Sequence, residues 1–364
     1  MGKLELDAET AEAAVFGGAV LGGGGGGCIA EGLKLAKLAL KLGKPSLINL
    51  EELSEEDILL TVSIVGAPAA REQYVSPQHY IRAVELVREN AGVEVRGLIS
   101  SEIGSLGAVN GWVQAALLGL PVVDAPCDGR AHPTGIMGSM GLHRAEGYLS
   151  CQAAVGGREA RYLELFVRAS LENAAALVRQ VSVLAGGMVA VARNPAPASY
   201  VKKHGAPGAM RQAIEIGRRM LACKEQGGEK VAQEIAASLG GKVIACGRVE
   251  EVKLTTEGGF DRGTVLIGAE GRKIELAFWN EYMTLEEEGR RLATFPDLIA
   301  NLNSQGTPLS SSEIKAGDEV YILYVPKENL LLGAGLKDLA LYRQVEEAIG
   351  RPVLKYLERW AELV

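Results

Sequence analysis

The stretch from Leu21 to Leu42 reads LGGGGGGCIAEGLKLAKLALKL and decides the fold. Its six consecutive glycines follow a short strand-like run, and apolar residues then recur every three or four positions with lysines between them. This spacing predicts an amphipathic helix that begins near Cys28. A glycine loop that leads into a helix N-terminus presents backbone N–H groups to a ligand, although a flexible turn or a close helix-to-strand contact would also use glycines. We expect a substrate-binding loop at Gly24, Gly25, Gly26, Gly27 and Cys28.

The same loop matches the dinucleotide fingerprint GxGxxG only trivially, because any run of glycines satisfies that pattern. Glu51 or Glu52 follows the next predicted strand, where a carboxylate would bind a ribose. No GK[ST] sequence follows the glycines, so the loop is not a Walker A phosphate loop. A nucleotide site therefore stays open as an alternative.

Predicted strands and helices alternate through the first part of the chain. The strands fall at 45–50, 58–65, 93–99 and 121–124, and the helices at 29–42, 79–90 and 111–118. Such alternation predicts an α/β fold with a mostly parallel sheet flanked by helices. We assign residues 1–165 to this N-terminal domain with its glycine-rich loop.

The pattern of apolar and polar residues changes in the second part of the chain, which we assign to residues 166–364. We expect a helix over 163–180, a strand over 181–191, a loop at 194–197 and helices at 209–222 and 336–349. Short apolar runs separated by Gly, Asp and Pro predict strands at 242–250, 263–267, 273–280 and 319–325. The expected C-terminal domain is α+β, with a β-rich module at about 241–330.

In a parallel sheet the ligand crevice lies outside the carboxyl ends of the strands. Four predicted loops fall there, at 22–28, 66–68, 100–104 and 124–133. Glu102 follows a predicted strand and would act as a general base or bind a substrate N–H, unless it only caps a helix or faces solvent. Asn110 would orient the ligand, unless Asn-Gly marks a simple turn.

The segment from Asp124 to Pro133, DAPCDGRAHP, concentrates ionisable residues. Asp124, Cys127 and His132 offer O, S and N ligands for a divalent metal, with zinc favoured, although their spacing matches no established zinc signature. Alternatively Cys127 is a nucleophile whose thiolate is favoured by Arg130 or a protonated His132, or it is an inert buried thiol. We expect Asp124 and Cys127 to join Glu102 in catalysis and Arg130 to bind substrate.

The β-rich module also carries polar residues. Residues 256–263 are typical of a hairpin, and Asn280 and Glu281 close a predicted strand. These two side chains would reach the site if the module leans over the sheet edge.

Composition excludes several classes of protein. Lys and Arg number 38 against 45 Asp and Glu, for a formal charge of −7, and no basic run is present, which argues against nucleic-acid binding. The longest apolar stretch is too short and glycine-rich for a membrane span, and no signal peptide is recognised. Five scattered cysteines without a CxxC motif indicate reduced thiols in a cytoplasmic protein. A hydrophobic content of 48% is compatible with a homo-oligomer. The partner that we expect is a small-molecule substrate.

Taken together, these motifs resemble the S-methyl-thiohydantoin desulfurase-like family, which was long catalogued as a domain of unknown function and is often encoded beside hydantoinase or oxoprolinase genes. The resemblance spans nearly the whole chain and rests on Leu21–Gly27, Gly66–Pro68, Glu102–Gly104, Asn110, Leu120–Asp124, Gly129–Ala131, Gly241–Val243, Gly259–Gly263, Asn280–Glu281 and Pro296–Ile299.

The resemblance implies an N-terminal α/β domain, a C-terminal domain with substantial β structure, and activity on five-membered cyclic ureides or their sulfur analogues. The reaction for which the family is named hydrolyses an S-methyl thiohydantoin to a hydantoin and methanethiol. This sequence departs from the family pattern at Cys28, at Ala125–Asp128 and at His132. These departures place two thiols and an imidazole at the expected site, which would suit a metal, a covalent step or another leaving group.

Two functions of different class follow. The first is a hydrolase acting on a hydantoin-like or thiohydantoin-like ring. The second is a non-catalytic protein that binds a nucleotide or another ligand, or an accessory subunit of a hydantoinase or oxoprolinase system.

Overall fold

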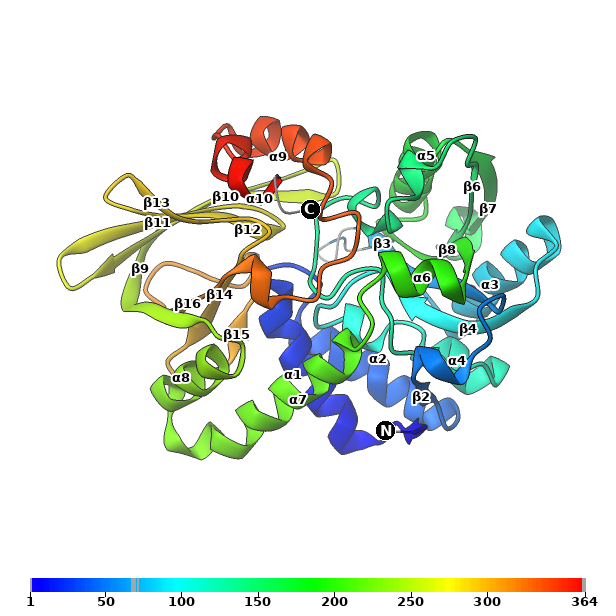
Figure 1. Ribbon diagram of the computed structural model, residues 1–364, viewed down its shortest axis with the longest axis horizontal. Helices are drawn as coiled ribbons and strands as arrows, with labels where there is room; N and C mark the ends of the chain where they lie inside the picture. The colour runs from blue at the N-terminus through cyan, green and yellow to red at the C-terminus, as the bar shows by residue number, and fades with distance from the viewer. Residues whose placement is uncertain (1, 67–69, 71, 362–364) are drawn as a thin grey trace.

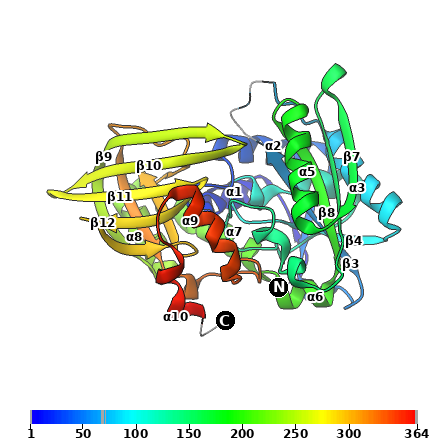
Figure 2. The same ribbon diagram turned by 90° about the horizontal axis from the view of Figure 1, so that it is seen from above.

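A computed structural model describes residues 2–66, 70 and 72–361 of the chain. Its elements form two sheets, each with eight strands within the described residues, which lie side by side with helices α1 and α7 beneath them in Figure 1. Figure 2 shows the C-terminal helices α9 (Tyr342–Ile349) and α10 (Glu358–Ala361) beside the second sheet. The predicted class, an α/β region followed by a β-rich α+β region, is confirmed.

The first sheet has the order β1-β2-β5-β4-β3-β8-β6-β7. Its parallel part is β2 (Ser46–Ile48), β5 (Val122–Val123), β4 (Val95–Ser100) and β3 (Ile58–Gly66). Antiparallel strands extend both edges: β1 (Leu4–Glu5), and β8 (Met188–Pro197), β6 (Ser150–Gly156) and β7 (Leu163–Ala169). This sheet therefore takes strands from both sides of residue 165.

Helices cover both faces of the first sheet. Alternate residues of β6 point to opposite faces, so Ala153 packs in the core with α3 (Pro77–Ala91) while Ala154 packs with α5 (Leu171–Leu184). The α3 face also carries α1 (Ala8–Gly22), α2 (Ile29–Leu42) and α4 (Trp112–Leu118), and the α5 face carries α6 (Ala198–His204). The period-two alternation thus buries both faces of the sheet.

Helix α7 (Ala209–Cys223) packs closely on α1 because small residues line the contact. A Cβ at Gly17 would overlap the carbonyl of Ala213, and one at Gly217 would overlap that of Ala13. Larger side chains at these two glycines would force the helices apart. Helix α8 (Gly228–Ser238) then leads into the second sheet.

The second sheet is antiparallel throughout its described strands and has the order β13-β12-β11-β10-β9-β16-β14-β15. Its strands are β9 (Lys242–Glu257), β10 (Phe260–Ala269), β11 (Arg272–Trp279), β12 (Glu281–Glu287), β13 (Arg290–Thr294), β14 (Leu298–Asn303), β15 (Pro308–Leu309) and β16 (Glu319–Val325). The predicted hairpin is present: Gly258 and Gly259 turn between β9 and β10 with positive φ. A separate apolar cluster that includes Val265 and Ile322 stabilises this sheet.

Several local predictions are wrong. Residues 163–169 form strand β7, whose side chains alternate before the helical pattern of α5 begins. Residues 194–197, expected as a loop, belong to β8, and β6 was not predicted. The glycine run follows helix α1 rather than a strand, because a stretch of Ala, Val and Gly gave little periodicity. In the expected loop at 66–68, Ala67 and Pro68 lie outside the described residues.

The helices of the described chain are also informative about membranes. None of them combines the length and the apolar character needed to cross a bilayer.

Candidate functional site

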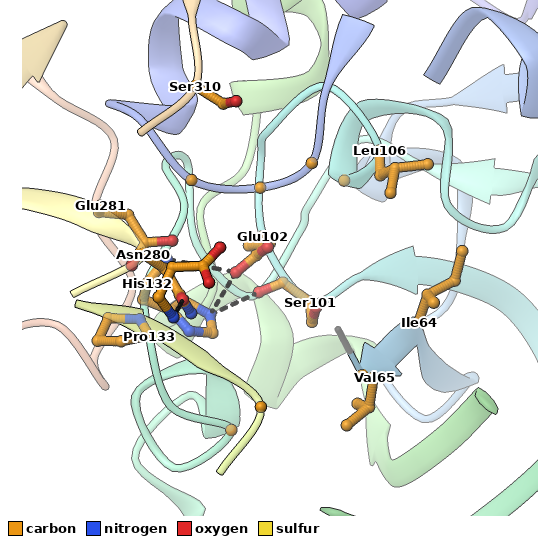
Figure 3. Close-up of a pocket in the computed structure, with 18 of the residues that line it drawn as sticks. Ile64, Val65, Ser101, Glu102, Leu106, His132, Pro133, Asn280, Glu281 and Ser310 are labelled. Atoms are coloured by element: carbon orange, nitrogen blue, oxygen red, sulfur yellow. Dashed lines mark hydrogen bonds and ion pairs between the residues drawn. The ribbon is translucent and has the colours of Figure 1, made fainter. Parts of the chain in front are cut away.

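A cavity of about 420 Å³ is lined by both halves of the chain. One wall comes from the glycine loop and from residues at the carboxyl ends of β3 and β4, as the parallel-sheet prediction required. The opposite wall comes from the β9–β10 hairpin, the β11–β12 turn and residues 310–313. In Figure 3, Glu102, His132, Asn280 and Glu281 gather on one side and Leu106, Ile64 and Val65 on another. Such a cavity suits a small ring with polar and apolar edges.

Backbone hydrogen bonds hold the glycine loop in place. Helix α1 ends at Gly22, and Gly23 caps it in the left-handed region with φ 56°. The N–H of Tyr282 then donates to Gly23 O at 2.8 Å, and the N–H of Ser311 donates to Gly24 O at 2.8 Å. Since Tyr282 and Ser311 come from the second sheet region, the C-terminal half fixes the loop of the N-terminal half.

The glycines are needed for close packing. A Cβ at Gly25 would overlap the Glu281 carboxylate, and one at Gly26 would lie 2.6 Å from Gly104 Cα. Gly26 and Gly27 also have φ of 72° and 87°, which side chains other than glycine rarely adopt. The loop is therefore a packed structure and not a flexible turn.

The glycine loop also offers unused donors. Within the described part of the chain, the backbone N–H groups of Gly26, Gly27 and Cys28 have no protein acceptor, and all three residues line the cavity. Cys28 is the N-cap of α2, so the free N–H groups stand at a helix N-terminus. They can receive a carbonyl oxygen or an anion of a ligand.

Glu102, two residues beyond β4, borders the cavity with a side chain that is 20% exposed. Its Oε2 accepts a hydrogen bond from the His132 backbone N–H at 3.3 Å and lies 3.6 Å from His132 Nε2. The same Nε2 lies 3.3 Å from Ser101 O. Because Nε2 faces acceptor oxygens, we assign its hydrogen to Nε2, which leaves Nδ1 as a bare acceptor.

Burial of His132 favours its neutral form. Burial lowers the pKa of His132, and the negative charge of Glu102 only partly opposes this effect. Its Nδ1 is buried and has no partner among the described residues. A neutral imidazole held this way orients the Glu102 carboxylate.

Glu281 begins β12, directly after the turn residue Asn280, whose φ is 58°. Its side chain is only 1% exposed, and Oε2 has no partner within the described residues. Burial raises the pKa of Glu281 well above its ordinary value; the nearby charge of Glu102 adds to the rise and Arg130 opposes it. The cavity thus pairs a buried carboxyl group, for which burial favours the protonated form, with a second and more exposed carboxyl group.

The segment from Asp124 to Arg130 lies behind the cavity. Asp124 Oδ1 accepts hydrogen bonds from the N–H groups of Met210 at 2.9 Å and Arg211 at 3.3 Å, and Oδ2 pairs with Arg211 Nε at 3.3 Å. Asp124 therefore caps helix α7 and is absent from the cavity wall.

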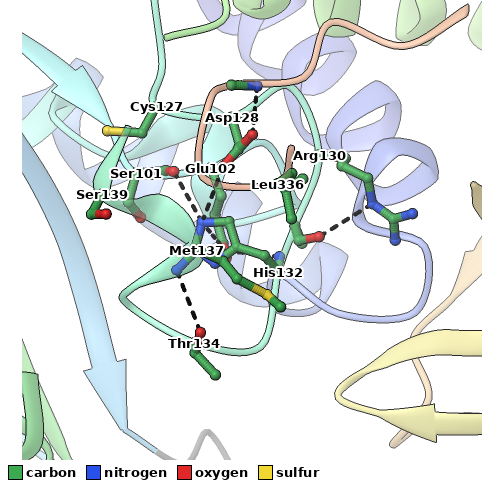
Figure 4. A network of polar contacts seen from close by, with 12 residues as sticks. Ser101, Glu102, Cys127, Asp128, Arg130, His132, Thr134, Met137, Ser139 and Leu336 are labelled. Carbon is green, nitrogen blue, oxygen red and sulfur yellow. Dashed lines mark hydrogen bonds and ion pairs between the residues drawn. The ribbon is translucent and has the colours of Figure 1, made fainter. Parts of the chain in front are cut away.

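Cys127 is also absent from the cavity wall, and Figure 4 shows its thiol pointing away from His132. Its Sγ lies 3.3 Å from Thr61 Oγ1, and burial raises the pKa of Cys127 to about 12. This is the reverse of the activated thiolate considered from the sequence. Asp124 and Cys127 follow the end of strand β5, as the sequence predicted. Their side chains pack against other parts of the chain and do not line the cavity.

Arg130 supports the loop from behind. Its Nη1 donates to Pro296 O at 2.8 Å and to Asp297 O at 2.6 Å, and its guanidinium lies 4.5 Å from the centre of the Phe295 ring. Burial lowers the pKa of Arg130 to about 10. Arg130 does not line the cavity, so the structure does not place it where we expected it to bind substrate. Instead its guanidinium lies beside Gly23 and supports the glycine loop.

The predicted metal ligands are not brought together. His132 faces the cavity, whereas Asp124 and Cys127 do not. Across the described residues, no group of three or more His, Cys, Asp or Glu side chains is arranged to hold a metal ion. Glu51 and Glu52 lie in an exposed turn and do not line the cavity, and a helix precedes the loop, so the strand-loop-helix of a dinucleotide site is absent here.

The cavity therefore unites many of the predicted residues. Those that line it are Gly24, Gly25, Gly26, Gly27, Cys28, Glu102, Asn110 and His132, together with Asn280 and Glu281 from the module expected to lean over the site. Sequence reasoning missed Arg179 and Arg193, which also line it. A signal existed for Arg193, since a charged residue that directly follows the apolar run of a buried strand is unusual.

Comparisons with known proteins agree with this architecture. Residues 9–162 match the S-Me-THD-like N-terminal domain, and residues 169–336 match the S-Me-THD-like C-terminal domain. A crystal structure of a structural-genomics protein from Chromobacterium violaceum has the same fold, with a TM-score of 0.72 and 21% identity over 94% of this chain and 97% of that one. No curated protein matches. With both family domains present in order, the chain belongs to the S-methyl-thiohydantoin desulfurase-like family.

Proposed function

We propose that the chain is a hydrolase of hydantoin-like, thiohydantoin-like or related cyclic ureide rings. The observation that carries this proposal is the pair Glu102 and Glu281, two carboxyl groups of different environment that face one cavity beside free backbone N–H groups. Acid–base hydrolysis needs one group that accepts a proton and one that donates it; Glu281, whose pKa burial raises, suits the donor, and the more exposed Glu102 suits the acceptor. Family membership supports the ring class of the substrate.

The reaction can be written with an S-methyl thiohydantoin as substrate. Glu102 accepts a proton from water as the water oxygen bonds to the ring carbon that carries sulfur. The carbon–sulfur bond then breaks, and Glu281 donates its proton to the departing methanethiolate, which gives a hydantoin and methanethiol. Proton exchange with solvent restores both carboxyl groups.

The remaining groups hold the ring. The N–H groups of Gly26, Gly27 and Cys28 would receive a ring carbonyl oxygen, on which negative charge grows during attack. His132 acts as a positioning residue through its contact with Glu102 at 3.6 Å. Asn110, which is buried in the cavity wall, offers an amide for a ring N–H or carbonyl.

The test is turnover of an S-methyl thiohydantoin by the purified full chain, followed by release of free thiol. Glu281→Gln should lower kcat by about 10²–10⁴-fold, because the amide cannot donate the proton. Glu94→Gln, a change at an exposed carboxylate distant from the cavity wall, is the matched control and should retain wild-type rates.

The hydrolase proposal requires the wild-type protein to turn over at least one of these rings. If wild-type protein releases no thiol and hydrolyses none of a panel of hydantoins, the hydrolase proposal is wrong. Stabilisation by one of those rings or by a nucleotide without turnover would then favour the non-catalytic ligand-binding protein or accessory subunit.

A divalent metal, with zinc favoured, stays a separate prediction. Elemental analysis of protein purified without a histidine tag or chelator tests it directly. Near-stoichiometric zinc that is lost in His132→Ala would support the prediction, and protein without metal would contradict it.

A further inference from the structure

Arg193 is a buried cation that no carboxylate of the described residues contacts directly. It lies within β8 between Thr61 of β3 and Gln152 of β6, and it is only 5% exposed while lining the cavity. Among the described residues, no hydrogen bond or ion pair of its guanidinium is found and its Nε is fully buried, while the charges of Glu102 and of Cys127, when ionised, act on it from beyond contact distance. A buried guanidinium without a partner is strongly unfavourable, so its retention needs a reason.

Arg179 approaches the same part of the cavity from α5. Its guanidinium lies 4.6 Å from the centre of the Phe260 ring, and Nη1 donates weakly to Gly259 O at 3.4 Å. No ion pair to a described carboxylate is present. Burial lowers the pKa of Arg179, the positive charge of Arg193 lowers it further, and the charge of Glu102 opposes both effects. Two cations therefore stand close together on one wall.

Two other arginines of the described chain are paired with carboxylates. Arg291, whose side chain is 3% exposed, binds Glu286 at 2.8 Å, and Arg351 contacts Glu286 and Glu275. Arg130, which is fully buried, donates to the carbonyl oxygens of Pro296 and Asp297, whereas no such acceptor is found for Arg193 among the described residues. Gly135 leaves space beside Arg193, since a Cβ there would lie 2.9 Å from Arg193 Nη1.

We propose that Arg179 and Arg193 form a subsite for a carboxylate carried on a substituent of the ring substrate. This inference rests on the proposed function for the ring and adds the substrate class, a cyclic ureide with an acidic side chain. Guanidinium groups bind carboxylates through paired, charge-assisted hydrogen bonds, which gain strength where water is excluded. Ala175 and Val178 of α5, beside Arg179, provide an apolar wall for the stem of the substituent.

The test is calorimetric titration of the full chain with three probes: 5-hydantoinacetic acid, neutral 5-methylhydantoin, and succinate, which is an acid without the ring. Wild-type protein should bind the acidic hydantoin at least about tenfold more tightly than the neutral one. Arg193→Met and Arg179→Met should each remove most of that preference, and Arg193→Lys should keep part of it. Arg168→Met, a change at an exposed arginine of β7, should match wild type.

Equal affinity for the acidic and neutral rings in wild type, or an unchanged preference in Arg193→Met, overturns the subsite. No Arg193-dependent response to either carboxylate probe also overturns it. Thermal melts establish that each variant is folded, and Arg179→Met gives a second reading if Arg193→Met is not.

The two proposals fail in different ways. Arginine-dependent binding of the acids without turnover of any ring would retain the subsite and reject the hydrolase. Turnover of neutral rings without any acid preference would retain the hydrolase and reject the subsite.

Discussion

The cavity wall and the strand end at Asp124 and Cys127 are both rich in reactive side chains, yet the protein uses their polar atoms differently. At the strand end, the atoms are satisfied internally: Asp124 caps α7 and pairs with Arg211, and Cys127 contacts Thr61. In the cavity, Glu281 and Arg193 keep buried polar atoms without described partners. Residue type alone does not mark a site; hydrogen-bonding capacity left free at a cavity does.

The largest difference is expected when one carboxylate is removed from each region. Glu102→Gln should lower kcat by about 10²–10⁴-fold, because an amide cannot accept the proton of water. Asp124→Asn should leave kcat within about threefold of wild type, since its oxygens face α7 and not the cavity. Steady-state kinetics on one ring substrate measures both, and a larger effect in Asp124→Asn would reverse the assignment.

The free energy of unfolding should fall more when the Asp124 carboxylate is removed than when the Glu102 carboxylate is removed. Asp124→Ala leaves the N–H groups of Met210 and Arg211 without their acceptor and should lower the free energy of unfolding by about 2–3 kcal/mol. Glu102→Ala, at a more exposed side chain, should lower it by less than about 1 kcal/mol. Urea denaturation followed by circular dichroism gives both values, and equal losses would contradict the distinction.

Glu281 makes stability depend on pH. Burial raises its pKa in the folded state above that of the unfolded chain, so the folded protein binds this proton more tightly. Its contribution is full below the unfolded pKa of about 4.3 and is lost as pH rises through the higher folded value, at about 1.4 kcal/mol for each unit of difference. The melting temperature of Glu281→Gln should therefore fall less than that of wild type as pH rises. Parallel curves would show that Glu281 is not protonated in the fold.

The smallest expected effect concerns Cys127. Cys127→Ala should retain activity and lose about 1 kcal/mol of stability, because it removes one buried sulfur atom. Alkylation of the native protein should modify exposed Cys246 well before Cys127, whose pKa burial raises to about 12. Mass spectrometry of the labelled peptides decides the order, and rapid modification of Cys127 would place it at an accessible site.

Sequence reasoning predicted the position of the site better than its chemistry. Periodicity placed Glu102 at the end of a strand, and Glu102 borders the cavity. The glycine loop borders it too, although the loop follows helix α1 and not the strand that was predicted. Arg179 could not have been predicted, because nothing near α5 distinguishes it from a surface arginine until α5 packs beside the β9–β10 hairpin. The confusion of β7 with a helix arose because a short alternating run passes directly into a helical pattern.

By itself, the sequence determined the alternation of strands and helices, the β-rich second part and the edge at which a ligand would bind, because these depend on the spacing of neighbouring residues. Only the tertiary structure decided which ionisable groups are available to a ligand. That choice depends on contacts between distant segments: Asp124 is taken up by α7, while Glu281 from the second sheet is brought to the glycine loop and to Glu102. Burial and hydrogen-bond partners are properties of the packed chain, and no local pattern encodes them.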